Sequence, residues 1–209
     1  FEHFQKFIMP SLLATRATQR RIRIWCAAAS TGQEPYSLAM VLKEMGKQVD
    51  GFKIEILATD ISLEVLEKAK AGIYSQFEVQ RGLPVQLLIK HFTQIGDMWQ
   101  ISPAIRAMVQ YRPLNLLRDF SSLGMTDVIF CRNVLIYFDQ VTKIDVMNRM
   151  AKLVPPDGFL TLGAAETVVG LTDSLKPVAG QRGVYSPNVA APAAKPVGGI
   201  PKFTPAPIA

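Results

Sequence analysis

Apolar and polar residues along the chain form blocks that switch between a strand-like and a helix-like period. Short, nearly continuous apolar runs are typical of parallel strands buried on both faces. They alternate with segments in which apolar residues recur at helical spacing. The predicted strands cover residues 23–26, 52–60, 126–133 and 158–166, and the predicted helices cover residues 1–17, 34–45, 61–72 and 139–153. This alternation predicts an α/β fold with a mostly parallel sheet and helices on both faces.

Turn and cap residues support these boundaries. Pro10 is expected to kink or restart the first helix, because proline lacks an N–H group. Pro35 lies in the first turn of its helix, where proline is tolerated. Ser62 is a plausible N-cap for the next helix, and Gly72 is placed to close it.

Residues 73–113 break the alternation and predict a small inserted subdomain, mostly β. Within it we expect a helix at 84–92 and strands at 98–102 and 107–113. The segment "LKPVAGQRGVYS" (175–186) predicts an antiparallel hairpin at the C-terminal end of the sheet.

Residues 187–209 are rich in proline and alanine, have no hydrophobic period and are expected to be a flexible tail or linker. The chain is therefore expected to hold one domain, residues 1–186, followed by this tail. With 209 residues, 49% of them hydrophobic, the domain can bury a sizeable core.

No apolar run approaches the roughly 18 residues that a membrane span needs, so no membrane insertion is expected. There is no secretory signal pattern, which favours a cytoplasmic location. Phe1 already lies in an amphipathic run, so we interpret the chain as a piece of a longer protein, cut on its N-terminal side.

The net charge of +6 favours acidic partners: nucleic acid, an anionic surface or an acidic protein. The charge is scattered and no nucleic-acid-binding motif accompanies it, so no nucleic acid is expected. Cys26 and Cys131 are interpreted as reduced core residues, close to each other because each ends a strand-like run. His3 and His91 are far apart in the sequence, and no metal site is expected.

Small residues, "AAASTG" (27–32), connect the first strand to the following helix. In an open parallel sheet, ligands bind outside the carboxyl ends of the strands, so this loop should face a ligand. A phosphate-bearing dinucleotide favours G-x-G-x-x-G, which is absent, and Glu34 would repel phosphate. S-adenosylmethionine carries a sulfonium and an ammonium but no phosphate, and fits better.

Two further segments suit an adenosyl ligand. Asp60 ends the second strand, where a carboxylate can accept hydrogen bonds from both ribose hydroxyls; alternatively it only caps the next helix, together with Ser62. Asn115 can match an adenine edge and Leu116 can lie against the ring, although a loop asparagine is usually a turn residue.

Arg132 and Asn133 directly follow an apolar strand, at its ligand-facing end. An arginine there can hold an acceptor carboxylate with two hydrogen bonds. The alternative is a surface arginine followed by an asparagine in a turn.

Together, "AAASTGQEPYSLA", "ATDIS", "LNLL" and "FCRNVLIYFD" resemble the motifs of the CheR-type chemotaxis receptor methyltransferases, in the same order. The resemblance covers about residues 1–185 and implies a Rossmann-like class I methyltransferase fold. It also implies that the chain uses S-adenosylmethionine to methylate glutamates in the cytoplasmic domain of methyl-accepting chemoreceptors, and that the insertion helps to dock the receptor.

The resemblance also implies roles for individual residues. Glu34 would contact the methionine portion of the cofactor and Asp60 the ribose. Arg132 and Asn133 would line the site beside the donor methyl group. Asn115 and Leu116 would bind the adenosine side, and Tyr137 would lie near the acceptor glutamate. Arg132 and Tyr137 are thus the candidate catalytic residues.

Two departures from the family pattern matter. The chain begins after the family's basic, helical N-terminal domain, so its cofactor pocket is expected to be open on one side and its isolated activity to be weak. The turn "TQIGDMWQ" (93–100) is short, so we expect no need for a receptor tether peptide. Two rival functions remain: methylation of another acceptor, such as RNA or a small molecule, and a non-catalytic, cofactor-binding regulatory domain.

Overall fold

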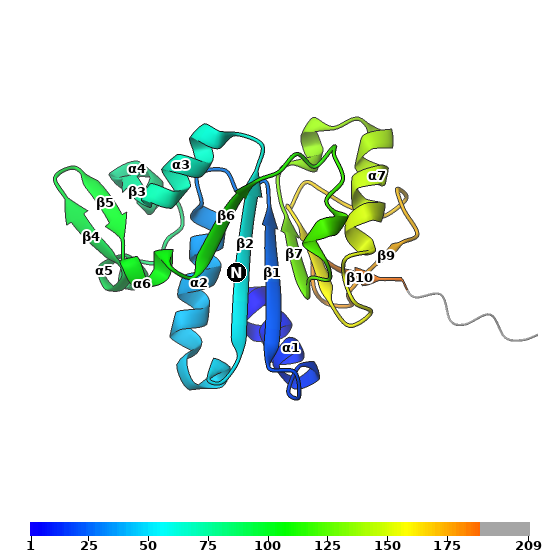
Figure 1. Cartoon of the computed structure of the whole chain (residues 1–209), viewed down its shortest axis with the longest axis horizontal. Coiled ribbons are helices and arrows are strands. Elements are labelled where there is room, and N and C mark those ends of the chain that lie inside the picture. Colours follow the sequence, from blue (N-terminus) through cyan, green and yellow to red (C-terminus); the bar gives the residue numbers. More distant parts are fainter. Residues whose placement is uncertain (189–209) are drawn as a thin grey trace, which may run out of the picture.

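The structure, a computed structural model, describes residues 1–188, which form an α/β fold around a large central sheet (Figure 1). The strands of this sheet run in the order β6-β2-β1-β7-β8-β10-β9. Their bounds are β1 Arg21–Ala27, β2 Lys53–Asp60, β6 Val109–Pro113, β7 Val128–Cys131, β8 Phe159–Leu162, β9 Leu175–Pro177 and β10 Val184–Pro187. The first five in that order are parallel, and β10 is antiparallel to both of its neighbours. The predicted fold class is confirmed, including the C-terminal hairpin.

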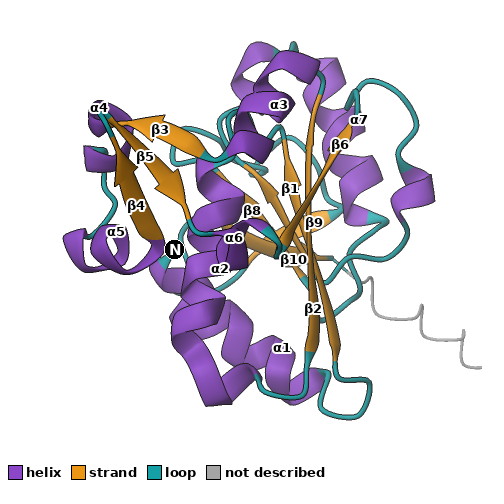
Figure 2. Cartoon of the chain, turned by 60° about the vertical axis from the view of Figure 1, so that its left-hand side comes forward, coloured by secondary structure: helices purple, strands orange, loops and turns teal. Residues whose placement is uncertain are grey.

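Helices cover both faces of the sheet (Figures 1 and 2). Their bounds are α1 Met9–Thr15, α2 Gln33–Met45, α3 Leu63–Ala71, α4 Gln76–Gln80, α5 Val85–His91, α6 Pro103–Arg106 and α7 Gln140–Ala151. A π-helix, η1 (Phe4–Ile8), precedes α1, and the 3₁₀ turns are η2 Gly46–Val49, η3 Ser121–Leu123 and η4 Leu135–Tyr137.

Alternate residues of β1 enter different hydrophobic cores, because successive side chains of a strand point to opposite faces. Ile24 and Cys26 pack in the cluster that contains the buried residues of α1 and α2. Trp25 and Ala27 pack in the cluster that contains the buried residues of α7. Cys131, on the neighbouring strand, belongs to this second cluster, so the two free, buried cysteines face opposite sides of the sheet.

The predicted cap residues act as expected. The Ser62 hydroxyl accepts the Val65 amide at 3.4 Å. Gly72 closes α3 with a φ of +62°. The α-helical part of the first helix starts at Met9, with Pro10 in its first turn, so Pro10 marks a restart of the helix.

The structure corrects two predicted segments. The strand expected over 158–166 ends at Leu162, and residues 163–166 form a turn. The strand expected at 107–113 as the last part of the insertion belongs to the central sheet, where β6 pairs with β2. The insertion proper carries a separate antiparallel sheet, in the order β3-β5-β4 (Figure 2). Its bounds are β3 Ile73–Ser75, β4 Phe92–Ile95 and β5 Met98–Ile101.

An ion-pair cluster centred on the buried Arg16 joins the end of α1 to the residues just before β7 and β8. The Arg16 side chain is 9% exposed and donates to Asp127 at 2.7 Å. It also donates twice to Asp157, at 2.6 and 2.8 Å, and this contact lowers the pKa of the Asp157 carboxyl. The other oxygen of Asp127 accepts the Arg23 amide at 2.7 Å, so the cluster links α1, β1 and β7.

The described residues end just after the last strand of the central sheet. Of the tail predicted at 187–209, Pro187 is the last residue of β10, and residues 189–209 lie outside the described residues. Within residues 1–188, no helix combines the length and the apolar character that crossing a membrane would require.

Candidate functional site

The loop after β1 has an unusual backbone at the carboxyl end of the sheet. Ala28 and Ser30 have φ values of +56° and +50°, in the left-handed region that costs a non-glycine residue about 1–3 kcal/mol. The loop is held by the Ala29 amide, which donates to the Thr59 carbonyl at 2.9 Å, and by the Ser30 amide, which donates to Asp60 Oδ2 at 2.9 Å. A strained and well-anchored loop at this position is typical of a binding site.

Gly32 shows why the loop uses small residues. Its φ is +91°, and a Cβ atom there would lie 2.6 Å from the Tyr111 hydroxyl and 3.0 Å from the Ala69 Cβ. Only glycine combines this backbone conformation with so little space.

Asp60 ties the loop to the end of β2. One oxygen accepts the Ser30 amide, and the other accepts the Ser62 amide at 3.0 Å. Asp60 therefore does cap the next turn, as the alternative interpretation held. An ionised carboxylate has about four acceptor positions, so two remain for a ligand. The ribose role stays a prediction.

Glu34 and Arg132 form an ion pair between the first turn of α2 and the end of β7. Arg132 Nη1 donates to Glu34 Oε2 at 2.9 Å, and the side chains are 18% exposed for Glu34 and 38% exposed for Arg132. Burial raises the pKa of the Glu34 carboxyl, and Arg132 only partly opposes this effect. The Glu34 carboxyl is partly buried and its pKa is raised, so a second positive charge nearby would stabilise its ionised form. This arrangement suits a cationic ligand.

A cavity of about 1090 Å³ opens beside this pair. Its walls include residues 28–31, Glu34, Arg132 and Asn133. Further lining residues come from the N-terminal segment and the insertion: Phe1, Glu2, Gln5, Lys6, Tyr74, Glu78, Val79, Arg81, Gly82, Leu83, Pro84, Leu87 and Phe92. Pockets for small molecules commonly measure about 300–1,000 Å³, so the cavity has room for a nucleoside-sized ligand and an incoming side chain.

The remaining predicted site residues do not line this cavity. Asn115 Oδ1 accepts the Leu117 amide at 2.9 Å, which is the turn role of the alternative interpretation. Leu116 is 6% exposed and packs in the core with Trp25. Both follow Leu114, whose amide donates to the Asp60 carbonyl at 2.9 Å, so the segment runs past the Asp60 end of β2.

Tyr137 lies on η4 and is 79% exposed, outside the cavity lining. The structure therefore brings Glu34, Arg132 and Asn133 together, with Asp60 joined to them through the loop. The cofactor and acceptor roles assigned to Asn115, Leu116 and Tyr137 stay predictions.

Three tyrosines form an aromatic cluster, and one of them connects the loop to the insertion. The Tyr74 hydroxyl, on β3, donates to the Thr31 carbonyl at 2.8 Å, and the Tyr36 hydroxyl donates to the Ala69 carbonyl at 2.7 Å. Tyr36 packs edge-to-face against both Tyr74 and Tyr111. Burial raises the pKa of all three phenols, so they stay neutral. Tyr36 and Tyr74 donate hydrogen bonds, whereas the buried Tyr111 hydroxyl has no hydrogen-bond partner among the described residues.

A comparison with protein-family models identifies the domain. The model described as "CheR methyltransferase, SAM binding domain" matches residues 1–184. The chain belongs to this CheR family. The match confirms the family predicted from the motifs, and its description names the predicted cofactor.

Individual CheR relatives agree with this assignment. The chain is 43% identical over 177 residues to chemotaxis protein methyltransferase 1 of Pseudomonas aeruginosa, covering 83% of this chain and 64% of that protein. It is 41% identical over 161 residues to the chemotaxis protein methyltransferase of Escherichia coli, covering 74% and 56%. The chain thus spans about three fifths of the length of these curated relatives.

Among solved structures, similarity is weaker. The magnesium protoporphyrin IX methyltransferase from Synechocystis, with bound SAH, aligns with a TM-score of 0.40 and 16% identity, covering 76% of this chain and 54% of that chain. A similarity at this level supports no inference about the CheR site.

One residue that holds the turn beside the candidate site escaped the sequence prediction. Glu166 follows β8, and its carboxylate accepts the backbone amides of Gly163, Asn133, Val134 and Leu135. A signal was available, because Glu166 stands shortly after an apolar run, as Asp60 does. It was missed because the predicted strand was extended through it.

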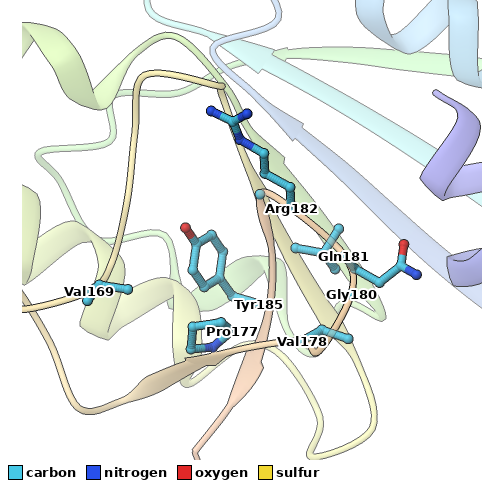
Figure 3. A pocket seen from close by; sticks show the side chains of 9 residues that line it. Val169, Pro177, Val178, Gly180, Gln181, Arg182 and Tyr185 are labelled. Carbon is cyan, nitrogen blue, oxygen red and sulfur yellow. The ribbon is translucent and has the colours of Figure 1, made fainter.

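A second, smaller cavity of about 500 Å³ lies at the C-terminal hairpin (Figure 3). Its lining includes Val169, Pro177, Val178, Arg182 and Tyr185. None of the predicted site residues lies in it, and its lining residues include no carboxylate to receive a cationic ligand. The larger cavity is therefore the candidate site.

Proposed function

We propose that this domain, within its full-length protein, transfers a methyl group from S-adenosylmethionine to glutamate side chains of bacterial chemoreceptors, forming methyl esters in chemotaxis adaptation. The observation that carries the proposal is the partly buried Glu34 carboxylate, paired with Arg132, on the wall of a cavity at the carboxyl end of the sheet. Membership of the CheR family and the names of the relatives support the choice of reaction.

The donor set fits this cofactor. Glu34 supplies negative charge for a cationic group, and Asp60 keeps two acceptor positions for a diol. Asn115 and Leu116 would serve the adenosine side, and Arg132 and Asn133 the methyl side. When bound, the cofactor supplies a methyl group on a positively charged sulfur, open to attack by a carboxylate.

In this reaction the protein contributes by positioning the two reactants, and it does not need to transfer a proton. A glutamate side chain has an ordinary pKa of about 4.3 and is already an anion at neutral pH, so no general base is needed. Arg132 uses one N–H on Glu34 and keeps others that can hold the incoming carboxylate. A bound acceptor that covers the cavity would displace water from both reacting groups, which would strengthen these contacts. Tyr137, exposed at the end of η4, would meet the acceptor segment as it enters.

The proposed partner is the cytoplasmic domain of methyl-accepting chemoreceptors, which places the protein in the cytoplasm. A chain with a net charge of +6 is attracted to helices that present clustered glutamates. Association should weaken as the salt concentration rises.

Two measurements on the full-length protein test the proposal. Calorimetry with S-adenosylmethionine and its product measures cofactor binding. A second assay measures base-labile methanol released after incubation with a receptor cytoplasmic fragment, with the same fragment carrying glutamine for glutamate as the control, and with RNA as a rival acceptor. Methanol release from the glutamate fragment alone supports the proposal. Binding without turnover would support the regulatory alternative, and transfer to RNA would support the other acceptor class.

A further inference from the structure

The turn that follows β7 is organised around a single carboxylate, that of Glu166. Oε2 accepts the amides of Gly163 at 2.7 Å and Asn133 at 2.8 Å. Oε1 accepts the amides of Val134 at 3.1 Å and Leu135 at 2.8 Å. These donors fill the roughly four acceptor positions of a carboxylate. Glu166 therefore has no position left for a ligand, and it is absent from the cavity lining.

We infer that Glu166 is a positioning residue for methyl transfer, acting through Asn133 and the turn after it. The inference rests on the proposed function. Asn133 has a φ of +60°, and three consecutive amides from Asn133 to Leu135 converge on one anion. Converging backbone N–H groups form a concave anion site, and burying them without an acceptor is costly.

The residues held by this anion carry the proposed chemistry. Arg132, which pairs with Glu34, immediately precedes the turn, and Asn133 lines the cavity from within it. Tyr137 stands on η4, whose first residue, Leu135, is one of the anchored positions. A shift of this turn would displace all three side chains together.

Gly163 shows how tightly the arrangement is packed. A Cβ atom there would lie 2.7 Å from Glu166 Oε2 and 3.0 Å from the Asn133 amide nitrogen. The φ of Gly163 is not in the left-handed region, so the constraint is steric. The glycine allows β8 to approach the turn closely enough for one carboxylate to bridge them.

Glu166→Gln tests the role of the carboxylate with the smallest change in side-chain shape. It keeps the size of the side chain but replaces one acceptor oxygen by an NH₂ group, which would face backbone N–H donors. We expect kcat to fall by about 10- to 100-fold, the range for a misplacement of about 1 Å. Glu34 and Asp60 lie on other elements, so the Kd for S-adenosylhomocysteine should rise by a smaller factor than kcat falls. Glu67→Gln, on the exposed face of α3, is the matched control and should retain wild-type kinetics.

Chemical rescue separates positioning from a general role in folding. Glu166→Ala leaves the amides without an acceptor, and added formate supplies a carboxylate to them. We expect formate to restore kcat in a concentration-dependent manner, whereas chloride at equal ionic strength does not. No rescue in a folded Glu166→Ala protein, or wild-type kcat in Glu166→Gln, would overturn the inference.

Amide hydrogen exchange in the wild-type protein provides a test that needs neither folded variants nor activity. The amides of Asn133 and Leu135 should exchange slowly, and their proton resonances should lie downfield. Exchange at the rate of an unstructured peptide would overturn the inference. An inactive wild-type enzyme would refute the proposed function, whereas an active wild type with an equally active Glu166→Gln would refute only the role of Glu166.

Discussion

Replacing Asp60 by alanine should weaken cofactor binding by about 1–3 kcal/mol, or about 5- to 150-fold in Kd. Two separate losses contribute. The first is direct: the proposed ribose contact, a hydrogen bond to a charged group, would disappear. The second is indirect and acts through the loop after β1.

The loop contribution follows from the conformation of Ser30. Its amide donates to Asp60 Oδ2 at 2.9 Å while its φ is +50°, a conformation that costs a non-glycine residue about 1–3 kcal/mol. Without the carboxylate, the loop can relax, and ligand binding must then restore its shape. The lost bond to the Ser62 amide affects the start of α3, and it should lower folding stability more than cofactor affinity.

A double-mutant cycle separates the two losses. Glycine adopts positive φ without penalty, so Ser30→Gly in the Asp60→Ala background should recover the loop contribution but not the direct one. The assay is calorimetry with S-adenosylhomocysteine on four proteins: wild type, both single variants and the double variant. Asp97→Ala, at the exposed tip of the β4–β5 hairpin, is the control. A Kd for Asp60→Ala within about twofold of wild type would refute the ribose assignment. If Ser30→Gly restored the full wild-type affinity in the Asp60→Ala background, direct contact between Asp60 and the ribose would be refuted.

Three further predictions concern stability and pH. Arg16→Ala should lower the free energy of unfolding, measured in urea, by about 3–5 kcal/mol, because it leaves the Asp127 carboxylate buried without its ion-pair partner. Burial raises the pKa of Glu34 and a bound cation favours its ionised form, so the cofactor Kd, measured by calorimetry, should rise as the pH falls through that raised pKa. Gly32→Ala should lower the free energy of unfolding by about 1–3 kcal/mol in thermal denaturation, because its φ is +91° and its Cβ would lie 2.6 Å from the Tyr111 hydroxyl.

Each of these three predictions has a matched control variant that separates the stated cause from a general effect of mutation. Arg21→Ala, whose side chain is 54% exposed, should change stability by no more than about 0.5 kcal/mol. Glu34→Gln should remove the pH dependence of cofactor affinity, and a pH dependence that persists would point to another group. Gly180 also has a positive φ, +73°, but no atom lies within 4 Å of the position that a Cβ atom would take there. A loss from Gly32→Ala no larger than that from Gly180→Ala would contradict the steric explanation.

The central sheet could be predicted because its parallel strands are buried on both faces. β7 was expected within 126–133 and runs over Val128–Cys131, all four of them buried, since a doubly buried strand appears in the sequence as one apolar run. The strands β3 and β4 were not predicted. They have three and four residues, with one buried residue in β3 and none in β4, so neither produces a run or a clear alternation.

The site could be predicted where a polar residue directly follows a buried strand or opens a helix. Glu34, Arg132 and Asn133 obey this rule and line one cavity. Leu116 does not, because its burial against Trp25 depends on how distant segments pack together. Glu166 also stands shortly after a buried strand, but the predicted strand ran through it. Its role was not visible in the sequence, because three of its four partners lie more than 30 positions earlier in the chain.

The bond from Tyr74 to the Thr31 carbonyl limits how the insertion can be exchanged between relatives. A chimera that carries the small β-sheet of another protein must also place a phenol at position 74. Without it, the chimera loses the hydrogen bond that holds the Thr31 wall of the pocket. The insertion is therefore part of the pocket's architecture, and it is not an interchangeable module.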